Sequence, residues 1–309
     1  MILGSEAYIK SPVLNTHNLA PIQINSINLE YTQLVKNLGI WLTPTLTWKS
    51  HVDHILKKVH SALGSLHFHR KSLSIPLKKQ LILALVLPHF DYGSLVYFDL
   101  DKTRVNELQV AHNSCIRFIF GYIPFIPNMH ISTHLTQKRL ELGWLSLSGR
   151  RHLQLAHLSY KTIALQKPSY LSDRLKLRSH QQITSRSLRL PPRPFDFPSP
   201  RTEAWKTSFS ISSRMLLNTL VVTLIHRSRV TEFKKWLYTI FLKQEIEQWR
   251  CRALRENLLS LNLLSNLPHP PLPLNESAFT FTNTFLNTTG YTLRLPFIDP
   301  RTYNLRSHL

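Results

Sequence analysis

The sequence predicts a mainly α-helical protein with a short β segment at its N-terminus, on three observations. From Ser50 to about Leu165, apolar residues recur at steps of three and four, the period of an amphipathic helix. Residues 1–48 instead contain short apolar runs separated by turn residues, which is typical of strands. Residues 256–309 are rich in Asn, Thr, Ser and Pro, a composition that predicts a disordered tail.

Three strands are predicted in the N-terminal segment, at Met1–Leu3, Ile22–Leu29 and Leu34–Leu42. The pattern at Met1 begins without a preceding turn and looks like the edge of a sheet that has been cut through. Pro44 then breaks the apolar run, and Thr47 or Ser50 can cap the helix that follows. The apolar face of that helix consists of Val52, Ile55, Leu56, Val59, Ala62, Leu63 and Leu66.

Five further helices are predicted from periodicity and from start and stop residues. Pro88 stops the first, while Asp101 caps the second and Gly121 ends it. Their expected positions are Leu77–Leu87, the segment between Asp101 and Gly121, Leu147–Leu165, Ser210–Leu217 and Thr231–Gln244.

A basic, proline-rich segment near the middle of the chain, from Arg174 to Lys206, predicts a linker or extended arm. The expected division is therefore residues 1–48 with the strands, 49–172 helical, 173–208 as linker, 209–255 helical and 256–309 as tail.

The balance of charge predicts a polyanionic partner. Among 309 residues, 38 Lys and Arg stand against 17 Asp and Glu, a formal net charge of +21. Nucleic acid is the commonest partner of such a chain, and a soluble basic protein without one is the alternative. Two cysteines cannot build a disulfide framework, and the longest apolar run, Leu81–Leu87, is far below the roughly 20 residues of a membrane span. We expect an intracellular protein, nuclear or cytoplasmic, that is not secreted and has no membrane partner.

Several motifs follow one another along the chain in a recognisable order. They include KNLGIWLTPTLTW at 36–48, LVLPHFDYGSLVY at 85–97, NELQVAHNSCIRFIFG at 106–121 and LGWLSLSGRR at 142–151. In this order they resemble the C-terminal part of a non-LTR (LINE-type, jockey-like) retrotransposon reverse transcriptase. The resemblance implies that residues 1–48 are residual palm strands with the join to the thumb, and that 49–172 are the helical thumb and connector.

The parent family is an RNA-directed DNA polymerase that uses Mg²⁺, held by carboxylates in a Phe/Tyr-Ala-Asp-Asp turn. Two-metal catalysis needs such carboxylates to hold the ions about 4 Å apart. The turn does not occur in this sequence, and Asp99 and Asp101 are expected to serve in a loop and a helix cap. We therefore expect a fragment that is not itself an enzyme, with no cofactor. The family has Leu-Asp where Leu42 and Thr43 stand and Pro where Ser146 stands; the alternative is thus a non-functional helical relic of a decayed element.

The candidate binding residues lie on the first long helix and just after it. The segment from Lys49 to Lys79 combines seven cations with interleaved aromatic and His rings, which suits contacts with phosphates and bases. In the family this helix lies against the template and primer. The expected nucleic-acid-binding residues are Lys49, His51, Lys57, Lys58, Arg70 and Lys71. The expected partners are RNA, DNA or their hybrid, and also the palm and fingers of the parent polymerase; a merely solvated helix face is the alternative.

A metal site is a further, weaker hypothesis. His130 and His134 have the HxxxH spacing that places two imidazoles on one helical face, and Cys115 or His112 could add a ligand for zinc. With 16 histidines this spacing arises readily by accident. Cys115 near His112 is interpreted as core packing, and no metal or catalytic residue is predicted.

Overall fold

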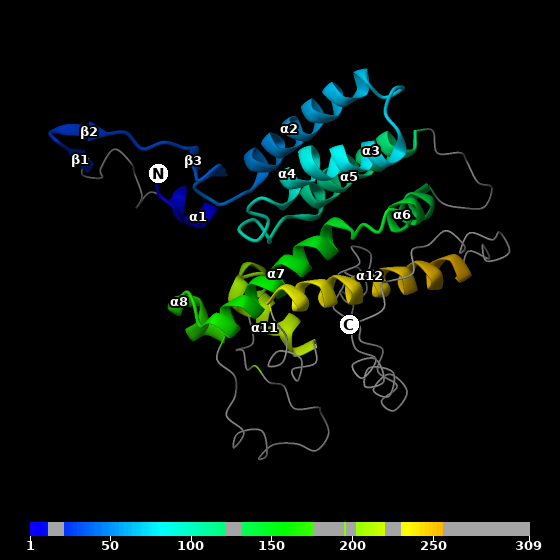
Figure 1. Ribbon diagram of the computed structural model, residues 1–309. Helices are drawn as coiled ribbons and strands as arrows, with labels where there is room; N and C mark the ends of the chain where they lie inside the picture. Colours follow the sequence, from blue (N-terminus) through cyan, green and yellow to red (C-terminus); the bar gives the residue numbers. More distant parts are fainter. Residues whose placement is uncertain (12–21, 122–130, 176–194, 196–201, 220–229, 256–309) are drawn as a thin grey trace, which may run out of the picture. The chain divides into compact units, whose positions relative to one another are not determined.

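The computed structural model describes residues 1–11, 22–121, 131–175, 195, 202–219 and 230–255. The chain divides into two compact units, 1–121 (unit 1) and 122–309 (unit 2), which are described separately. Helices dominate both, and two small two-stranded sheets occur in unit 1, so the predicted mainly α fold with an N-terminal β part is confirmed (Figure 1). The predicted tail, 256–309, lies outside the described residues.

Unit 1 begins with a short helix and two β-hairpins, and continues with helices. Helices α2 and α5 pack against each other, and α3, η3 and α4 follow one another between them in the sequence (Figure 1). The elements are α1 (Glu6–Ile9), β1 (Ile22–Ile24), β2 (Ile27–Leu29), β3 (Val35–Asn37), β4 (Ile40–Leu42), α2 (Lys49–Phe68), α3 (Ile75–Leu81), η3 (Ile82–Val86), α4 (Leu87–Asp91) and α5 (Lys102–Phe120).

Each of the two longer predicted strands is in fact an antiparallel hairpin. In the first, Asn25 and Ser26 both have positive φ and form a two-residue turn between β1 and β2. In the second, Leu38 and Gly39 do the same between β3 and β4, with φ of 46° and 83°. Two central residues with positive φ are the type I′ arrangement, whose twist matches that of paired strands. Predicting single strands there was wrong because these turns were not recognised.

The predicted strand at Met1–Leu3 is also wrong. These residues lie outside any strand, and Ser5 starts helix α1 by accepting a hydrogen bond from the Tyr8 amide at 3.2 Å. One backbone bond, from Gly4 N to Pro44 O at 3.0 Å, ties this end of the chain to the turn after β4.

Helix α2 buries four of the seven residues of its predicted apolar face, while Leu56, Ala62 and Leu66 are half-buried. Val52, Ile55, Val59 and Leu63 are all buried, because their spacing of three and four residues places them on one face. The predicted caps are wrong: Trp48 holds the N-cap position, with no side-chain cap hydrogen bond.

Helix α5 matches its prediction closely. Its N-cap, Asp101, accepts a hydrogen bond from the Arg104 amide at 2.8 Å, and Gly121 ends the helix with φ of 77°. Its buried face includes Cys115, Ile116 and other apolar side chains of the core.

Pro88 does not stop the helical path that begins at Ile75. Between α3 and α4 the chain forms a π-helical turn, η3, and Pro88 lies in the first turn of α4. Proline is tolerated in a first turn because its missing N–H has no partner there in any case. The predicted stop at Pro88 is therefore wrong.

Unit 2 is built around two long helices, α7 and α12, which pack together; α6 also packs against α12, and α11 against α7. Helix α7 has the predicted bounds, while α12 runs well beyond the predicted end at Gln244. The described elements are α6 (Ile131–Glu141), α7 (Leu147–Leu165), α8 (Ser169–Ser172), η4 (Asp173–Leu175), α10 (Glu203–Lys206), α11 (Phe209–Thr219) and α12 (Val230–Arg255).

Two described residues of the predicted linker belong to the core of unit 2. Phe195 is 1% exposed, and its backbone N and O form hydrogen bonds of 2.9 Å with the Asn218 side chain on α11. Leu175, at the start of the segment, is also buried. The linker interpretation is therefore wrong at these two positions; 176–194 and 196–201 lie outside the described residues.

Candidate nucleic-acid interface

The six sequence-predicted binding residues do not form one patch. Lys49, Lys57 and Lys58 are exposed on α2, whereas Arg70 and Lys71 follow its C-terminal end. A helix of 20 residues is about 30 Å long, so the two ends of α2 cannot contact the same phosphate. The structure separates Lys49 at the start, the Lys57–Lys58 pair in the middle, and Arg70 with Lys71 beyond the end.

His51 is a correction to the predicted site. It is 3% exposed, accepts a hydrogen bond through Nδ1 from the Trp41 amide at 3.5 Å, and places its ring edge-on to Tyr97 at 4.8 Å. Burial lowers the pKa of His51, and the charges of His54 and Lys58 lower it further. This imidazole therefore joins the β3–β4 hairpin to α2 and does not face solvent.

Around Lys58 the structure gathers basic groups from three elements. Lys36 comes from β3, His54 and Lys57 from α2, and His89 from α4. Burial is the largest cause that lowers the pKa of His54, and the positive charges of Lys58, Lys36 and Lys57 lower it further. Burial also lowers the pKa of His89, and the positive charge of Lys58 adds to this effect. We call Lys36, His54, Lys57, Lys58 and His89 the Lys58 cluster.

Trp41 on β4 is the aromatic centre of the Lys58 cluster. The Lys36 ammonium lies 5.9 Å from the centroid of its ring, a cation–π contact. His54 lies edge-on to the same ring, with centroids 5.8 Å apart and planes at 67°. Lys36 and Trp41 are cross-strand partners in the hairpin, so the turn at Leu38 and Gly39 is what brings them together.

No acid of α2 neutralises the cluster. Asp53 is the one acidic residue of that helix, and it forms an ion pair with Arg104 of α5 at 3.6 Å. Within the described part of the chain, neither Lys57 nor Lys58 forms an ion pair with a carboxylate. Mutual repulsion among cations favours binding of an anion, which is the arrangement expected of a phosphate-binding surface.

Sequence reasoning found Lys57 and Lys58 but missed Lys36, Trp41, His54 and His89. A signal was present for three of them: His54 is one helical turn before Lys58, and Lys36 pairs with Trp41 once the two-residue turn is recognised. His89 comes from a separate helix and had no such signal.

A second group of predicted residues, beyond the end of α2, lacks a comparable arrangement. Phe68 is 90% exposed, and His67 packs edge-on against Phe118 at 5.2 Å. Lys78 also lies 5.9 Å from the Phe118 ring. Arg70 and Lys71 stay predicted contacts at this end.

The two aspartates near α5 have the structural roles expected for them. Asp99 accepts a hydrogen bond from the Trp48 indole at 2.5 Å, and Asp101 caps α5. In the described residues, no three His, Cys, Asp or Glu side chains gather so that they could hold a metal ion.

The predicted alternative of a zinc site receives no support from its described members. His134 is buried, and His130 lies outside the described residues. Burial raises the pKa of the Cys115 thiol to about 12, and its Sγ lies 3.4 Å from the Ala111 carbonyl. A thiol with that pKa stays protonated near neutral pH, and zinc and electrophiles both require the thiolate.

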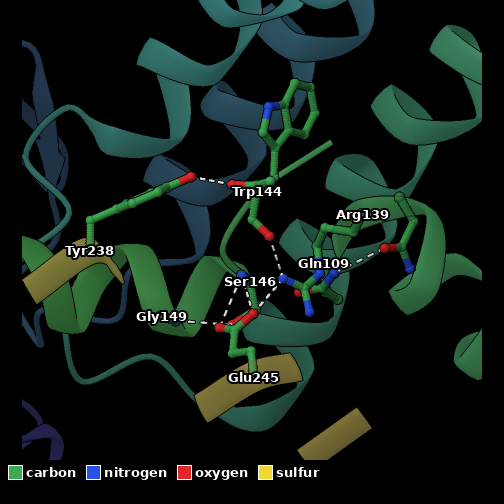
Figure 2. A network of polar contacts seen from close by, with 9 residues as sticks. Gln109, Arg139, Trp144, Ser146, Gly149, Tyr238 and Glu245 are labelled. Carbon is green, nitrogen blue, oxygen red and sulfur yellow. Dashed lines mark hydrogen bonds and ion pairs between the residues drawn. The ribbon is translucent and has the colours of Figure 1, made fainter. Parts of the chain in front are cut away.

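Unit 2 contains a buried ionic network around Glu245 of α12 (Figure 2). Ser146 donates to the carboxylate through its hydroxyl at 2.7 Å and through its amide at 3.1 and 3.2 Å. Arg139 forms an ion pair with Glu245 and also donates to the Trp144 carbonyl at 2.6 Å.

The same hydroxyl of Ser146 accepts a hydrogen bond from the Gly149 amide at 3.0 Å and so caps α7. Nearby, the Tyr238 hydroxyl of α12 donates to the Gly143 carbonyl (Figure 2). The network thus fixes the loop before α7 against α12. It is a structural element of the fold.

Comparisons with known proteins add no relative. Neither the protein-family models, nor the curated proteins, nor the solved structures include a significant match to the chain. The family relationship therefore stays a prediction from the motifs.

Among the described helices, none combines the length and apolar character needed to cross a bilayer.

Proposed function

We propose that this chain binds RNA, DNA or their hybrid through unit 1, with the Lys58 cluster contacting the phosphate backbone, and that it does not catalyse polymerisation. The observation that supports this most is the grouping of Lys36, Lys57, His54 and His89 around Lys58, without neutralisation by Asp53. Phosphate contacts of this kind are independent of sequence and weaken steeply with salt, because binding releases counterions.

The histidines add a feature that lysines alone lack. Burial and neighbouring positive charges lower the pKa values of His54 and His89, so both rings are mainly neutral near neutral pH. A bound phosphate would oppose that effect by favouring the charged imidazole. Binding of nucleic acid is therefore accompanied by proton uptake, and the affinity rises as the pH falls toward about 6.

The order of motifs supports an origin in the C-terminal part of a non-LTR retrotransposon reverse transcriptase. On that proposal unit 1 includes the join between palm and thumb, and the palm and fingers of the parent polymerase are additional partners. The sequence contains no adjacent pair of aspartates, so polymerase activity is not assigned to this chain.

Charge reversal in the cluster tests the binding site. The full chain is titrated into a fluorescently labelled RNA–DNA hybrid at about 50 mM salt, where phosphate contacts are strong, and binding is followed by anisotropy. We expect Lys57→Glu/Lys58→Glu to reduce affinity by at least about tenfold. The slope of log affinity against log salt should also decrease in magnitude, by about 1 for each phosphate that the variant no longer neutralises.

The matched control reverses two exposed lysines of unit 1 outside the cluster, Lys10→Glu/Lys102→Glu, with the same change in net charge. An equal reduction of affinity in both variants would contradict the site and leave only the net charge as the cause. Absence of any salt-dependent binding by the unmodified chain would contradict the function and favour the alternative, a helical relic without a selected binding activity.

A further inference from the structure

A second basic surface lies in unit 2, where helices α7 and α12 pack together. The rings of Tyr160 and Phe233 stack at this point, with centroids 3.8 Å apart and planes at 15°. Both rings are buried, at 2% and 1% exposure. Lys161 and Lys234, the residues that follow them, are exposed. The stack therefore holds the backbones of these two exposed lysines, on neighbouring helices, close together.

His157 joins these two lysines. It precedes Lys161 by four residues on α7, so the two side chains lie one above the other on the same face. Burial lowers the pKa of His157, and the charges of Lys234 and Lys161 lower it further, so both ammonium groups act on one imidazole. We call His157, Lys161 and Lys234 the Lys161 surface.

Nearby acids leave this surface positive. Helix α7 has no Asp or Glu. On α12, Glu245 belongs to the buried network and Glu247 pairs with Arg250 at 3.1 Å. Glu232 is the one other acid of α12 among the described residues; with burial it raises the pKa of Tyr160, so its carboxylate offsets one of the two lysine charges of the surface. In the described part of unit 2, no carboxylate forms an ion pair with Lys161 or Lys234.

We propose that the Lys161 surface is a second phosphate-binding site, which contacts the backbone of the same class of ligand, nucleic acid, independently of the Lys58 cluster. Charge complementarity selects a polyanion. The adjoining rings of Tyr160 and Phe233 are buried in the stack and are not themselves available to insert into a bilayer.

Lysine acetylation of the full chain, read by mass spectrometry, tests the surface directly. The chain is labelled with and without a saturating single-stranded DNA of about 40 nucleotides, at a salt concentration of about 50 mM, where phosphate contacts are strong. We expect Lys161 and Lys234 to be protected together, while Lys167, an exposed lysine beyond the end of α7, reacts equally in both samples. Equal reactivity of Lys161 and Lys234 with and without DNA would overturn the proposal.

Charge reversal supplies the second measurement. Lys161→Glu/Lys234→Glu should lower the affinity for the same DNA by at least about fivefold and reduce the salt slope by about 1 to 2. The matched control, Lys167→Glu/Arg252→Glu, makes the same change in net charge elsewhere in unit 2 and should have little effect. Equal reductions in the two variants would overturn the site.

The two proposals can fail separately. A reduced affinity in Lys57→Glu/Lys58→Glu alone would support the Lys58 cluster and overturn the Lys161 surface, and a reduction in Lys161→Glu/Lys234→Glu alone would do the reverse. Vesicles of anionic phospholipid form a further arm of the acetylation experiment. Protection of Lys161 and Lys234 by vesicles but not by DNA would overturn the assignment to nucleic acid.

Discussion

The Lys58 cluster of unit 1 and the Glu245 network of unit 2 use charged side chains in opposite ways. In unit 2, Arg139 and Glu245 are 7% and 5% exposed, and hydrogen bonds from Ser146 complete the shell around the carboxylate. In unit 1, Lys57 and Lys58 are exposed, and the acid of their own helix is paired with Arg104 on α5. Charge that is buried and matched holds the fold together, whereas charge that is exposed and unmatched is suited to a ligand.

The difference decides what a mutation changes. Removing one partner of a buried pair leaves an uncompensated charge out of water, at a cost of about 3–5 kcal/mol. Removing an exposed lysine from a group of like charges relieves repulsion and leaves the fold almost unchanged. Mutations in the Glu245 network should therefore change stability, and mutations in the Lys58 cluster should change binding.

The largest expected effect is that of Glu245→Ala. Arg139 would stay buried without its counter-ion and the Ser146 amide without an acceptor, so we expect unit 2 to lose about 3–5 kcal/mol of stability. Hydrogen exchange followed by mass spectrometry can assign this loss to unit 2. The matched control is Glu247→Ala on the same helix, whose exposed pair with Arg250 should contribute less than about 1 kcal/mol. Equal costs for the two variants would contradict the role given to the network.

A pair of glycine substitutions gives the next largest effect. A Cβ at Gly149 would overlap the Glu245 carboxylate and lie 3.3 Å from Ser146 Oγ, so Gly149→Ala should destabilise unit 2 by about 1–3 kcal/mol. Gly64 is exposed on α2 with nothing within 4 Å of the corresponding position, and Gly64→Ala should stabilise unit 1 by about 0.5–1 kcal/mol through helix propensity. Opposite signs in urea denaturation would confirm the pair; a stabilising Gly149→Ala would show that the carboxylate is free to move.

Some local signals were predicted correctly, although the two-residue turns of the hairpins, which are local as well, were missed. Helix α5 was predicted at both ends because Asp101 and Gly121 act within one turn of the chain. The network could not be predicted, since Arg139 and Glu245 are separated by 106 positions. In unit 1, Lys57 and Lys58 could be placed on the outer face of α2 from periodicity alone.

His51 shows an error that the sequence could have prevented. It precedes Ile55 and Val59 by one and two turns, so the helical period assigns it to the buried face. The resemblance to a thumb helix that lies against template and primer assigned His51 to the binding face instead. His89, in contrast, reaches the Lys58 cluster from a separate helix, which only the tertiary structure determines.

The pH dependence of stability gives a smaller effect, centred on His51. Burial holds the folded pKa of this imidazole below the ordinary value of about 6.5 found in unfolded chains. Its contribution to stability is therefore complete above pH of about 6.5 and is lost as the pH falls through the folded pKa, because the unfolded chain takes up the proton first. Hydrogen exchange of unit 1 at several pH values should show this decline. His51→Asn, which retains an acceptor for the Trp41 amide, should make the profile flatter; an unchanged profile would exclude His51 as its source.

The smallest expected effects are changes in histidine pKa that map the cluster itself. Lys58→Glu removes a cation that lowers the pKa values of both His54 and His89, so both values should rise. Lys57 acts on His54 but is not among the charges that lower the pKa of His89, so Lys57→Glu should raise the first value and leave the second unchanged. Titration of the imidazole Cε1 protons by NMR measures both groups in one experiment.

One outcome of the same titration would contradict the proposed Lys58 cluster. If Lys58→Glu raised the pKa of His54 alone, His89 would not belong to the cluster, and the phosphate-binding surface would be confined to the β3–β4 hairpin and α2. A rise of both pKa values would mean that charged groups from β3, α2 and α4 together form one positive surface for a ligand. The proton uptake that accompanies nucleic-acid binding should then involve both rings, and replacing either histidine by Gln should remove about half of the dependence of affinity on pH.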